Sequence, residues 1–319
     1  MTRLTPPSPW DEAPAPSGAG VGVPGIATTP AAVAIAATGG ATGLARWWRR
    51  FARSRGAVFG LVTLFALVGT ALFADVLAPY DPLQQGVGPP LAGPSLAHWA
   101  GTDSFGRDML SRMIHGARIA LAVGLFSVLL SMVVGVTLGL VAGYYGGLVD
   151  AVIMRVMDGL FAFPVIFLAI ATMAIMGFGV RNVIVAVAVG FVPPFARVTR
   201  GDVLAVKEEP YVEAARLAGV GTFAILLRHV LPNVLAPIIV QAALYVSGAI
   251  LTEAGLSFLG LGPPPPTPVW GSMIAEGRNF IVMAPHVSTI PGLVLTVSVI
   301  GLNLLGDGLR DTLDPRLRR

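Results

Sequence analysis

Glu213-Ala214-Ala215, followed by Gly219 and by Leu231-Pro232, is the stretch of sequence that decides the fold. It lies in a polar loop of 33 residues, Arg200 to Pro232, between two strongly apolar segments. Apolar segments of this kind are candidate membrane spans, because about 18 consecutive apolar residues are enough to cross a bilayer. The loop therefore joins two spans, and its position on one side of the membrane becomes the central question.

The composition favours a membrane protein built from helices. Hydrophobic residues make up 55% of the chain and charged residues 12%, whereas a soluble chain carries about 25% charged residues. Because lipid offers no hydrogen bonds to the backbone, long apolar runs should be helices. The arginines bracket apolar segments instead of forming one patch, which argues against nucleic-acid binding. The absence of cysteine excludes disulfides and thiolate chemistry.

Six candidate spans can be placed along the chain, giving an all-α polytopic protein. The fourth is the weakest, because it is short and ends in Pro193-Pro194, which break helical hydrogen bonding. The six expected spans are Ala57–Leu77, Ile119–Ala142, Ala151–Met176, Asn182–Phe195, Val234–Leu251 and Ser288–Leu305.

Basic residues predict the orientation of these spans. Five arginines, from Arg46 to Arg55, precede the first span and mark that side as cytoplasmic. Alternation then places fifteen basic residues inside and five outside, with Arg155 near the inner edge of the third span. Both termini and the loop Arg200 to Pro232 are therefore expected in the cytoplasm.

The loop itself is predicted to contain a short helix. Pro210 suits the first turn of a helix, where its missing amide hydrogen costs little, and Gly219 suits the left-handed turn that ends one. Between them, Tyr211, Ala214, Ala215 and Ala218 fall on one nearly flat face that could enter a narrow groove. Glu213 and Arg216 lie on the other side.

A second short helix is expected after the glycine. Thr222 is predicted to cap it, and Pro232 is predicted to stop it before the next span. On these grounds the loop is either a rigid knob that transmits force between proteins or an ordinary amphipathic loop at the membrane surface.

Two patterns within the spans predict helix packing. Gly135, Gly139 and Gly143 recur at every fourth position, which gives a smooth face for close approach of another helix. Arg155 and Asp158 are three residues apart and can pair on one helix face. A proton or ion relay is the alternative interpretation of this pair.

The loop resembles a known signature. Glu213-Ala214-Ala215, Gly219 and His229-Val230-Leu231-Pro232 are similar to the EAA signature of bacterial ABC importer permeases. His229 stands where the general signature prefers isoleucine. A histidine at this position resembles the dipeptide, oligopeptide and nickel branch of the family. The chain most resembles the C-type dipeptide permease, and further similar segments are Gly101-Thr102-Asp103, Gly106-Arg107-Asp108, Met154-Arg155, Asp158, Phe163-Pro164, Glu253, Leu256 to Gly262 and Trp270-Gly271.

The resemblance implies a type I ABC importer permease fold in a bacterial cytoplasmic membrane. Residues 46–117 would be the first transmembrane helix with an outer loop, and 118–316 the permease domain with its coupling loop, 200–232. Residues 1–45 lie outside the resemblance, and their richness in Pro, Ala, Gly and Thr predicts a disordered cytoplasmic tail. The resemblance also implies which residues receive the ATPase: Tyr211, Glu213, Ala214, Ala215, Ala218, Gly219, Leu231 and Pro232.

The implied partners are a homologous permease, two ATPase subunits, an extracytoplasmic peptide-binding protein and membrane lipid. ATP and Mg would bind to the ATPases, since Lys207, the only lysine here, lies in no phosphate-binding motif. The chain is therefore expected to be neither an enzyme nor a cofactor protein. Its four histidines show no metal-ligand spacing, and no metal site is predicted.

Alternatives to a peptide permease stay open at this point. Nickel or another small solute could be the cargo, because members for peptides and nickel share this architecture. An ion-coupled secondary transporter could use Arg155, Asp158 or Glu253, although such folds usually carry inverted repeats. A membrane scaffold that recruits a cytoplasmic partner is the third possibility.

Overall fold

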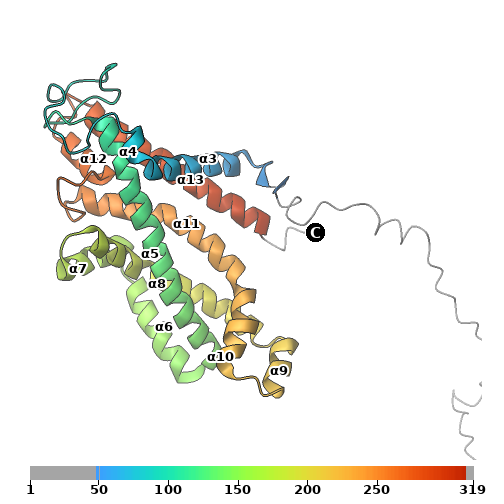
Figure 1. The fold of residues 1–319 in the computed structure, drawn as a ribbon. Helices are drawn as coiled ribbons and strands as arrows, with labels where there is room; N and C mark the ends of the chain where they lie inside the picture. The colour runs from blue at the N-terminus through green and yellow to red at the C-terminus, as the bar shows by residue number, and fades with distance from the viewer. Residues whose placement is uncertain (1–47, 50, 314–319) are drawn as a thin grey trace, which may run out of the picture. The chain divides into compact units, whose positions relative to one another are not determined.

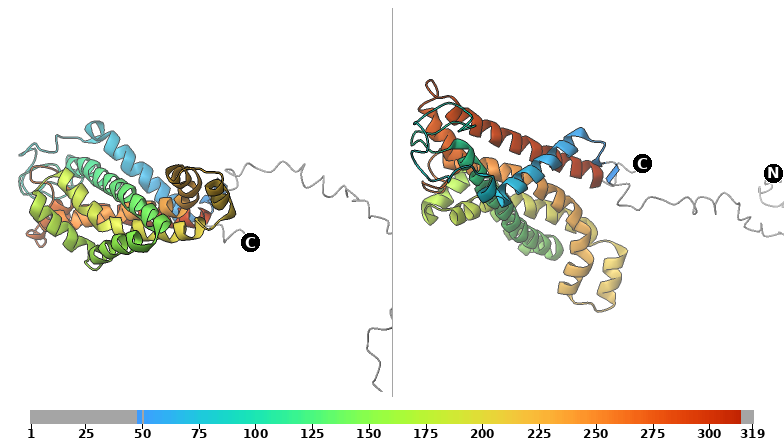
Figure 2. Two further views of the ribbon diagram at one scale, coloured as in Figure 1. Left: turned by 90° about the horizontal axis from the view of Figure 1, so that it is seen from below. Right: turned by 45° about the horizontal axis from the view of Figure 1, so that its top comes forward.

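A computed structural model describes residues 48–49 and 51–313 of the chain. The predicted tail, 1–45, lies outside these residues. Apart from an isolated bridge between Thr102 and Asp108, the secondary structure of the described part is helical (Figures 1 and 2). The helices are α3 (Arg55–Leu72), α4 (Ala74–Leu77), α5 (Met109–Tyr145), α6 (Gly147–Phe161), α7 (Val165–Met176), α8 (Val180–Val206), α9 (Pro210–Leu217), α10 (Thr222–Ile225), the π-helix η1 (Leu226–Val230), α11 (Leu231–Phe258), α12 (Trp270–Arg278) and α13 (His286–Leu313).

The described residues contain five or six candidate crossings, and six were predicted. Within the described residues, five helical stretches are long and apolar enough to cross a membrane: α3, α5, α8, Thr222–Phe258 and α13. Helices α6 and α7 meet at an angle of 94°, and they make a sixth crossing if the bent pair is counted as one span. The third predicted span is therefore a bent pair and not one straight helix.

Prolines explain both departures from the predicted spans. Pro164 stands between α6 and α7, and its side chain is exposed, so no packing holds the two helices in line. Pro193 is buried, and α8 continues through Pro193-Pro194 to Val206, so the prediction that this span ends there was wrong. A proline inside a helix costs about 3 kcal/mol, and the buried neighbours Phe191 and Phe195 provide the compensating contacts.

The glycine face of α5 packs against α8, as predicted. An added Cβ would lie 2.6 Å from the Phe195 Cβ at Gly135, 2.7 Å from the Thr199 Cβ at Gly139 and 2.8 Å from the Val203 Cβ at Gly143. Two serines of α5 reinforce this contact through bonds to α8 carbonyls, Ser127 to Ile184 at 3.0 Å and Ser131 to Ala188 at 2.9 Å. Such close approach of small residues is what holds helices together in lipid.

The loop between α4 and α5 is organised by a buried ionic network. Asp103 accepts a bond of 2.6 Å from the Arg107 Nε, and its other oxygen accepts the backbone N–H of Phe105 at 2.8 Å. Asp103 therefore holds a turn in this loop, and both charged side chains are buried. Asp108 caps α5 through the Ser111 N–H and also contacts the His98 ring nitrogen at 2.9 Å.

A second ionic contact joins this loop region to α5 at the surface. The Arg118 guanidinium contacts the Asp75 carboxylate at 2.8 Å, and the His115 ring lies 3.2 Å from the same group. The hydrogen bond from Arg118 lowers the pKa of Asp75 below its ordinary value. The carboxylate therefore stays charged at neutral pH and holds the end of α4 against α5.

Alanine substitutions test the glycine contact between α5 and α8. Gly139→Ala should destabilise the protein, because the new methyl group would meet the Thr199 Cβ at 2.7 Å. Gly69→Ala in α3 should be neutral or stabilising by up to ~1 kcal/mol, because nothing lies within 4 Å of its Cβ position and alanine favours helices. Thermal unfolding of the purified protein in detergent measures both. Equal effects of the two substitutions would contradict the packing.

The buried network predicts a large cost for one carboxylate. Asp103→Ala should destabilise the protein by about 3–5 kcal/mol, because it removes the shortest ion-pair contact of the buried Arg107 and the contact with Arg112. Arg107 would keep only the longer contact with Glu276, at 3.4 Å. Asp81→Ala, at an exposed position in the same loop, is the matched control and should have little effect. Urea unfolding in detergent checks the pair. A loss at Asp103 no larger than at Asp81 would show that the network contributes no stability.

Candidate functional site

Helix α9 forms where the sequence predicted it. Pro210 occupies its first turn, and Glu209 precedes it in an extended conformation. Val212 and Ala215 are buried, and they belong to the same apolar cluster as Ile225, Leu226 and Val230. The buried side of α9 therefore packs against α10 and η1, and α9 forms a rigid knob at the end of the α8 and α11 helices (Figure 1).

Gly219 ends α9 as predicted. Its φ of +78° lies in the left-handed region that favours glycine. The Val220 N–H bonds the Ala215 carbonyl at 3.1 Å, and the Gly219 N–H bonds the Arg216 carbonyl at 3.1 Å. This pattern is a Schellman-type ending, which usually brings an apolar residue after the glycine onto the helix. Val220 packs against the buried cluster accordingly.

The outward face of α9 differs from the predicted one. Of the four residues predicted to form a flat exposed face, Tyr211, Ala214 and Ala218 are exposed, but Ala215 is buried with Val212. The reason is that Val212 is the larger apolar residue and turns its own side of α9 toward the cluster. The exposed apolar side chains are Tyr211 (42% exposed), Leu217 (83%) and Phe223 (75%). We call these three residues the knob face.

The connection from α9 to α11 is more continuous than predicted. Gly221, not Thr222, is the residue that precedes α10, and no side-chain cap is formed. Pro232 does not stop the helix, because it stands in the first turn of α11. Its missing N–H is accommodated by the π-helix η1, in which the Leu231 N–H bonds back to Leu226. Helix therefore runs without a gap from Thr222 to Phe258.

Three contacts join the end of α8, the residue after it and α9 to the end of α5 and the start of α6. Arg200 binds Asp150 with two bonds, of 2.5 and 2.6 Å. The Lys207 Nζ donates to the Gly143 carbonyl at 3.0 Å, and the Arg216 guanidinium lies 5.7 Å from the Tyr144 ring centroid. These contacts were not predicted from the sequence. The only indication in the sequence was the presence of charged residues near the ends of apolar segments. Such residues do not identify partners that lie 50 or more residues away.

Asp158 has a different partner from the one predicted. Its carboxylate contacts the Arg197 guanidinium of α8 at 2.5 Å and does not pair with Arg155. Arg197 also lies over the Phe161 ring, 4.3 Å from its centroid. The helices α6 and α8 lie side by side, so a bond between helices replaces the predicted bond within one helix. Glu253, also considered for ion coupling, is buried in α11 and accepts a bond of 2.6 Å from the Ser257 hydroxyl.

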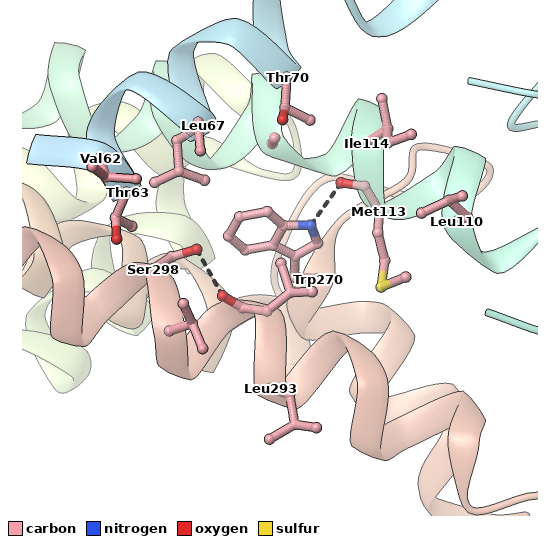
Figure 3. A pocket seen from close by; sticks show the side chains of 14 residues that line it. Val62, Thr63, Leu67, Thr70, Leu110, Met113, Ile114, Trp270, Leu293 and Ser298 are labelled. Carbon is pink, nitrogen blue, oxygen red and sulfur yellow. Dashed lines mark hydrogen bonds between the residues drawn. The ribbon is translucent and has the colours of Figure 1, made fainter. Parts of the chain in front are cut away.

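An apolar cavity of about 470 Å³ lies among α3, α5, α12 and α13 (Figure 3). Three polar side chains at its wall, those of Trp270, Ser298 and Thr63, donate hydrogen bonds to backbone carbonyls. The Trp270 Nε1 donates to the Met113 carbonyl at 2.9 Å, and the Ser298 hydroxyl donates to the Val294 carbonyl at 2.7 Å. Thr63 donates to the Phe59 carbonyl in the same way. This cavity suits an apolar neighbour and is not a candidate site for a polar cargo.

Two family models match the chain. The first, "Binding-protein-dependent transport system inner membrane component", covers residues 135–319. The second, "N-terminal TM domain of oligopeptide transport permease C", covers residues 44–94. The first match includes α9, Gly219 and the two spans that flank them. The EAA-like segment and the later similar segments therefore fall within a transport family, whereas Gly101 to Asp108 lies between the two matches.

Relatives and a solved structure agree with these matches. A glutathione transport system permease protein, GsiD, from Pectobacterium atrosepticum is 50% identical over 85% of this chain and 91% of its own length. A di/tripeptide transport system permease protein, DppC, from Pseudomonas aeruginosa is 47% identical over 86% and 93%.

The MetNI methionine ABC transporter, in an inward-facing conformation, contains a chain with a TM-score of 0.51 at 21% identity. The match covers 64% of this chain and 97% of the other, and it supports the fold alone. Together with the family models, these similarities confirm the resemblance found in the sequence. The chain belongs to the family of inner membrane components of binding-protein-dependent transport systems, and it has the fold of an ABC importer permease.

Proposed function

We propose that this chain is one of two permease subunits of an ATP-driven importer of short peptides. Its partners would be a homologous permease, two ATPase subunits and an extracytoplasmic peptide-binding protein. The ATPases would hold ATP and Mg and supply the energy. The observation that carries this proposal is the rigid knob of α9, whose apolar knob face is exposed while its rear is packed.

The construction of the knob supports a role in transmitting force. Helix α8 leads into α9 from one side, and the stretch Thr222–Phe258 leaves it without a gap on the other. Because Val212 and Ala215 are buried against the start of that stretch, a push on α9 would move both spans together. Exposed aromatic and aliphatic residues such as Phe223 and Leu217 are suitable anchors for a groove on another protein.

The orientation in the membrane follows from the charges. Arg200, Lys207 and Arg216 lie near the knob, and basic residues favour the cytoplasmic side. The knob would therefore face the cytoplasm, where ATP is available, and both termini would lie on that side. The loop that contains Asp103 and Arg107 would face outward, where a binding protein delivers its cargo.

Short peptides are the cargo that the comparisons favour. The relatives of this chain are named for glutathione and for di- and tripeptides, and glutathione is itself a tripeptide. We propose di- and tripeptides, including glutathione, as the substrate class. Nickel is the alternative that the sequence left open, and it predicts a different uptake profile.

Reconstitution tests the proposed function. The chain with its permease, ATPase and binding-protein partners should accumulate labelled dipeptide, tripeptide or glutathione in vesicles only when ATP is supplied. Radioactive Ni²⁺ serves as the competing cargo. Accumulation of Ni²⁺ but not of peptide would overturn the cargo assignment, and peptide uptake without any ATPase would overturn the importer mechanism.

The knob face predicts where the ATPase binds. Leu217→Asp or Phe223→Asp should weaken ATPase binding by about tenfold or more, because burial of such a side chain is worth about 1.5–3 kcal/mol. Leu96→Asp is the matched control, since Leu96 is 97% exposed in the loop at the other end of the helices. Co-purification of the ATPases measures the effect. Undiminished recovery with both knob variants would show that the ATPase contacts another surface.

A further inference from the structure

Three charged side chains lie exposed on the spans above the knob. The carboxylate of Asp158 is 54% exposed and the guanidinium of Arg197 is 40% exposed, although the two form an ion pair. Arg155 is exposed on the same helix as Asp158. We call these three residues the charged edge. Both α6 and α8 are parts of predicted membrane crossings, so the surroundings of this edge decide its role.

The exposed surface of α6 has two chemically different sides. Arg155 and Asp158 are three residues apart, and Ala151 and Ala162 continue their row below and above. The other exposed row contains Val149, Val152 and Val156. An exposed charge within a membrane span faces water or a polar partner, because its cost in lipid is several kcal/mol. The valine row suits lipid or an apolar subunit, and the charged edge suits an aqueous path.

The charged edge lies on two helices that are candidate membrane crossings, a few turns from the end of α8. Asp158 follows Asp150 by eight residues, which is about 12 Å along a helix. Asp150 pairs with Arg200 near the point where α8 leads to α9. Arg197 lies one turn before Arg200 on α8. A movement of the knob would therefore displace one side of the charged edge directly.

The charges of this edge favour an anion. The charged edge contains two guanidinium groups and one carboxylate, and Arg197 is already paired with Asp158. Arg155 has no ion-pair partner among residues 48–49 and 51–313. A guanidinium offers two parallel N–H groups that match a carboxylate, which gives strong and oriented binding. Free Arg155 is therefore the position at which a passing carboxylate can be held.

We propose that the charged edge faces the translocation pathway and that Arg155 binds the C-terminal carboxylate of a peptide in transit. Arg197 and Asp158 keep the neighbouring surface polar and hydrated. This inference rests on the proposed function, since it takes a short peptide as the cargo. It assigns a contact site to a pathway for which the sequence analysis named no lining residues.

Uptake by the complete reconstituted complex tests this assignment. Arg155→Gln should raise the KM for a tripeptide with a free C-terminus by about tenfold, while the KM for the C-amidated peptide stays unchanged. The binding protein is identical in both samples, so its own preference cancels when each variant is compared with the unaltered complex. Arg310→Gln, at an exposed position near the far end of α13, should change neither value.

The outcomes separate this proposal from the proposed function. Failure of the unaltered complex to import any peptide would sink the peptide importer itself. Normal import with equal KM changes for both peptides, or with none, would overturn the role of Arg155 alone. An effect that follows the anionic lipid content of the vesicles, and not the peptide C-terminus, would assign Arg155 to a lipid phosphate and overturn the proposal.

Cysteine labelling provides a second and independent readout. Because the chain contains no cysteine, Arg155→Cys and Val156→Cys can each be the only thiol of the subunit. A charged, water-soluble thiol reagent should modify the first but not the second in the assembled complex. Protection of Cys at 155 would show that this edge is covered by the partner permease or by lipid, and the proposal would be wrong.

Discussion

The close contact between α5 and α8 is the constraint on which the rest of this structure depends. In lipid there is little hydrophobic force between helices, so packing of small residues and interhelical hydrogen bonds must hold them. Gly139 brings the backbone of α5 against Ala196 and Thr199, and Ser131 adds a bond across the same interface. This contact fixes the position of α8. Helix α8 contains Arg197 and leads into α9.

Ion pairs stabilise the parts of the structure that lie outside the contact of α5 and α8. The pair of Asp150 and Arg200 anchors the end of α8 next to the knob, and the pair of Asp158 and Arg197 lies further along the same two helices. The buried network of Asp103 and Arg107 secures the opposite loop. The first two pairs each join α6 to α8, whereas Asp103 and Arg107 lie in the same loop. The knob face is the exception, because it is apolar and exposed.

Local signals made much of the coupling loop predictable from the sequence. Pro210 and Gly219 marked the two ends of α9 correctly, because their backbone preferences act within a few residues. The outward face was misjudged at Ala215, since burial there is decided by contacts of Val212 with residues beyond the glycine. Asp158 was assigned to Arg155 for a similar reason, because its actual partner lies 39 residues away. Prolines gave opposite outcomes at Pro164 and Pro193, and only their burial distinguishes the two positions.

The sidedness of α9 tests the account most directly. Leu217→Cys would be the only thiol of the chain, at a position that is 83% exposed. A membrane-impermeant maleimide should label it in inside-out membrane vesicles lacking the ATPases, and should fail to label it in right-side-out vesicles. The opposite result would place α9 outside the cell, where no ATPase could reach it.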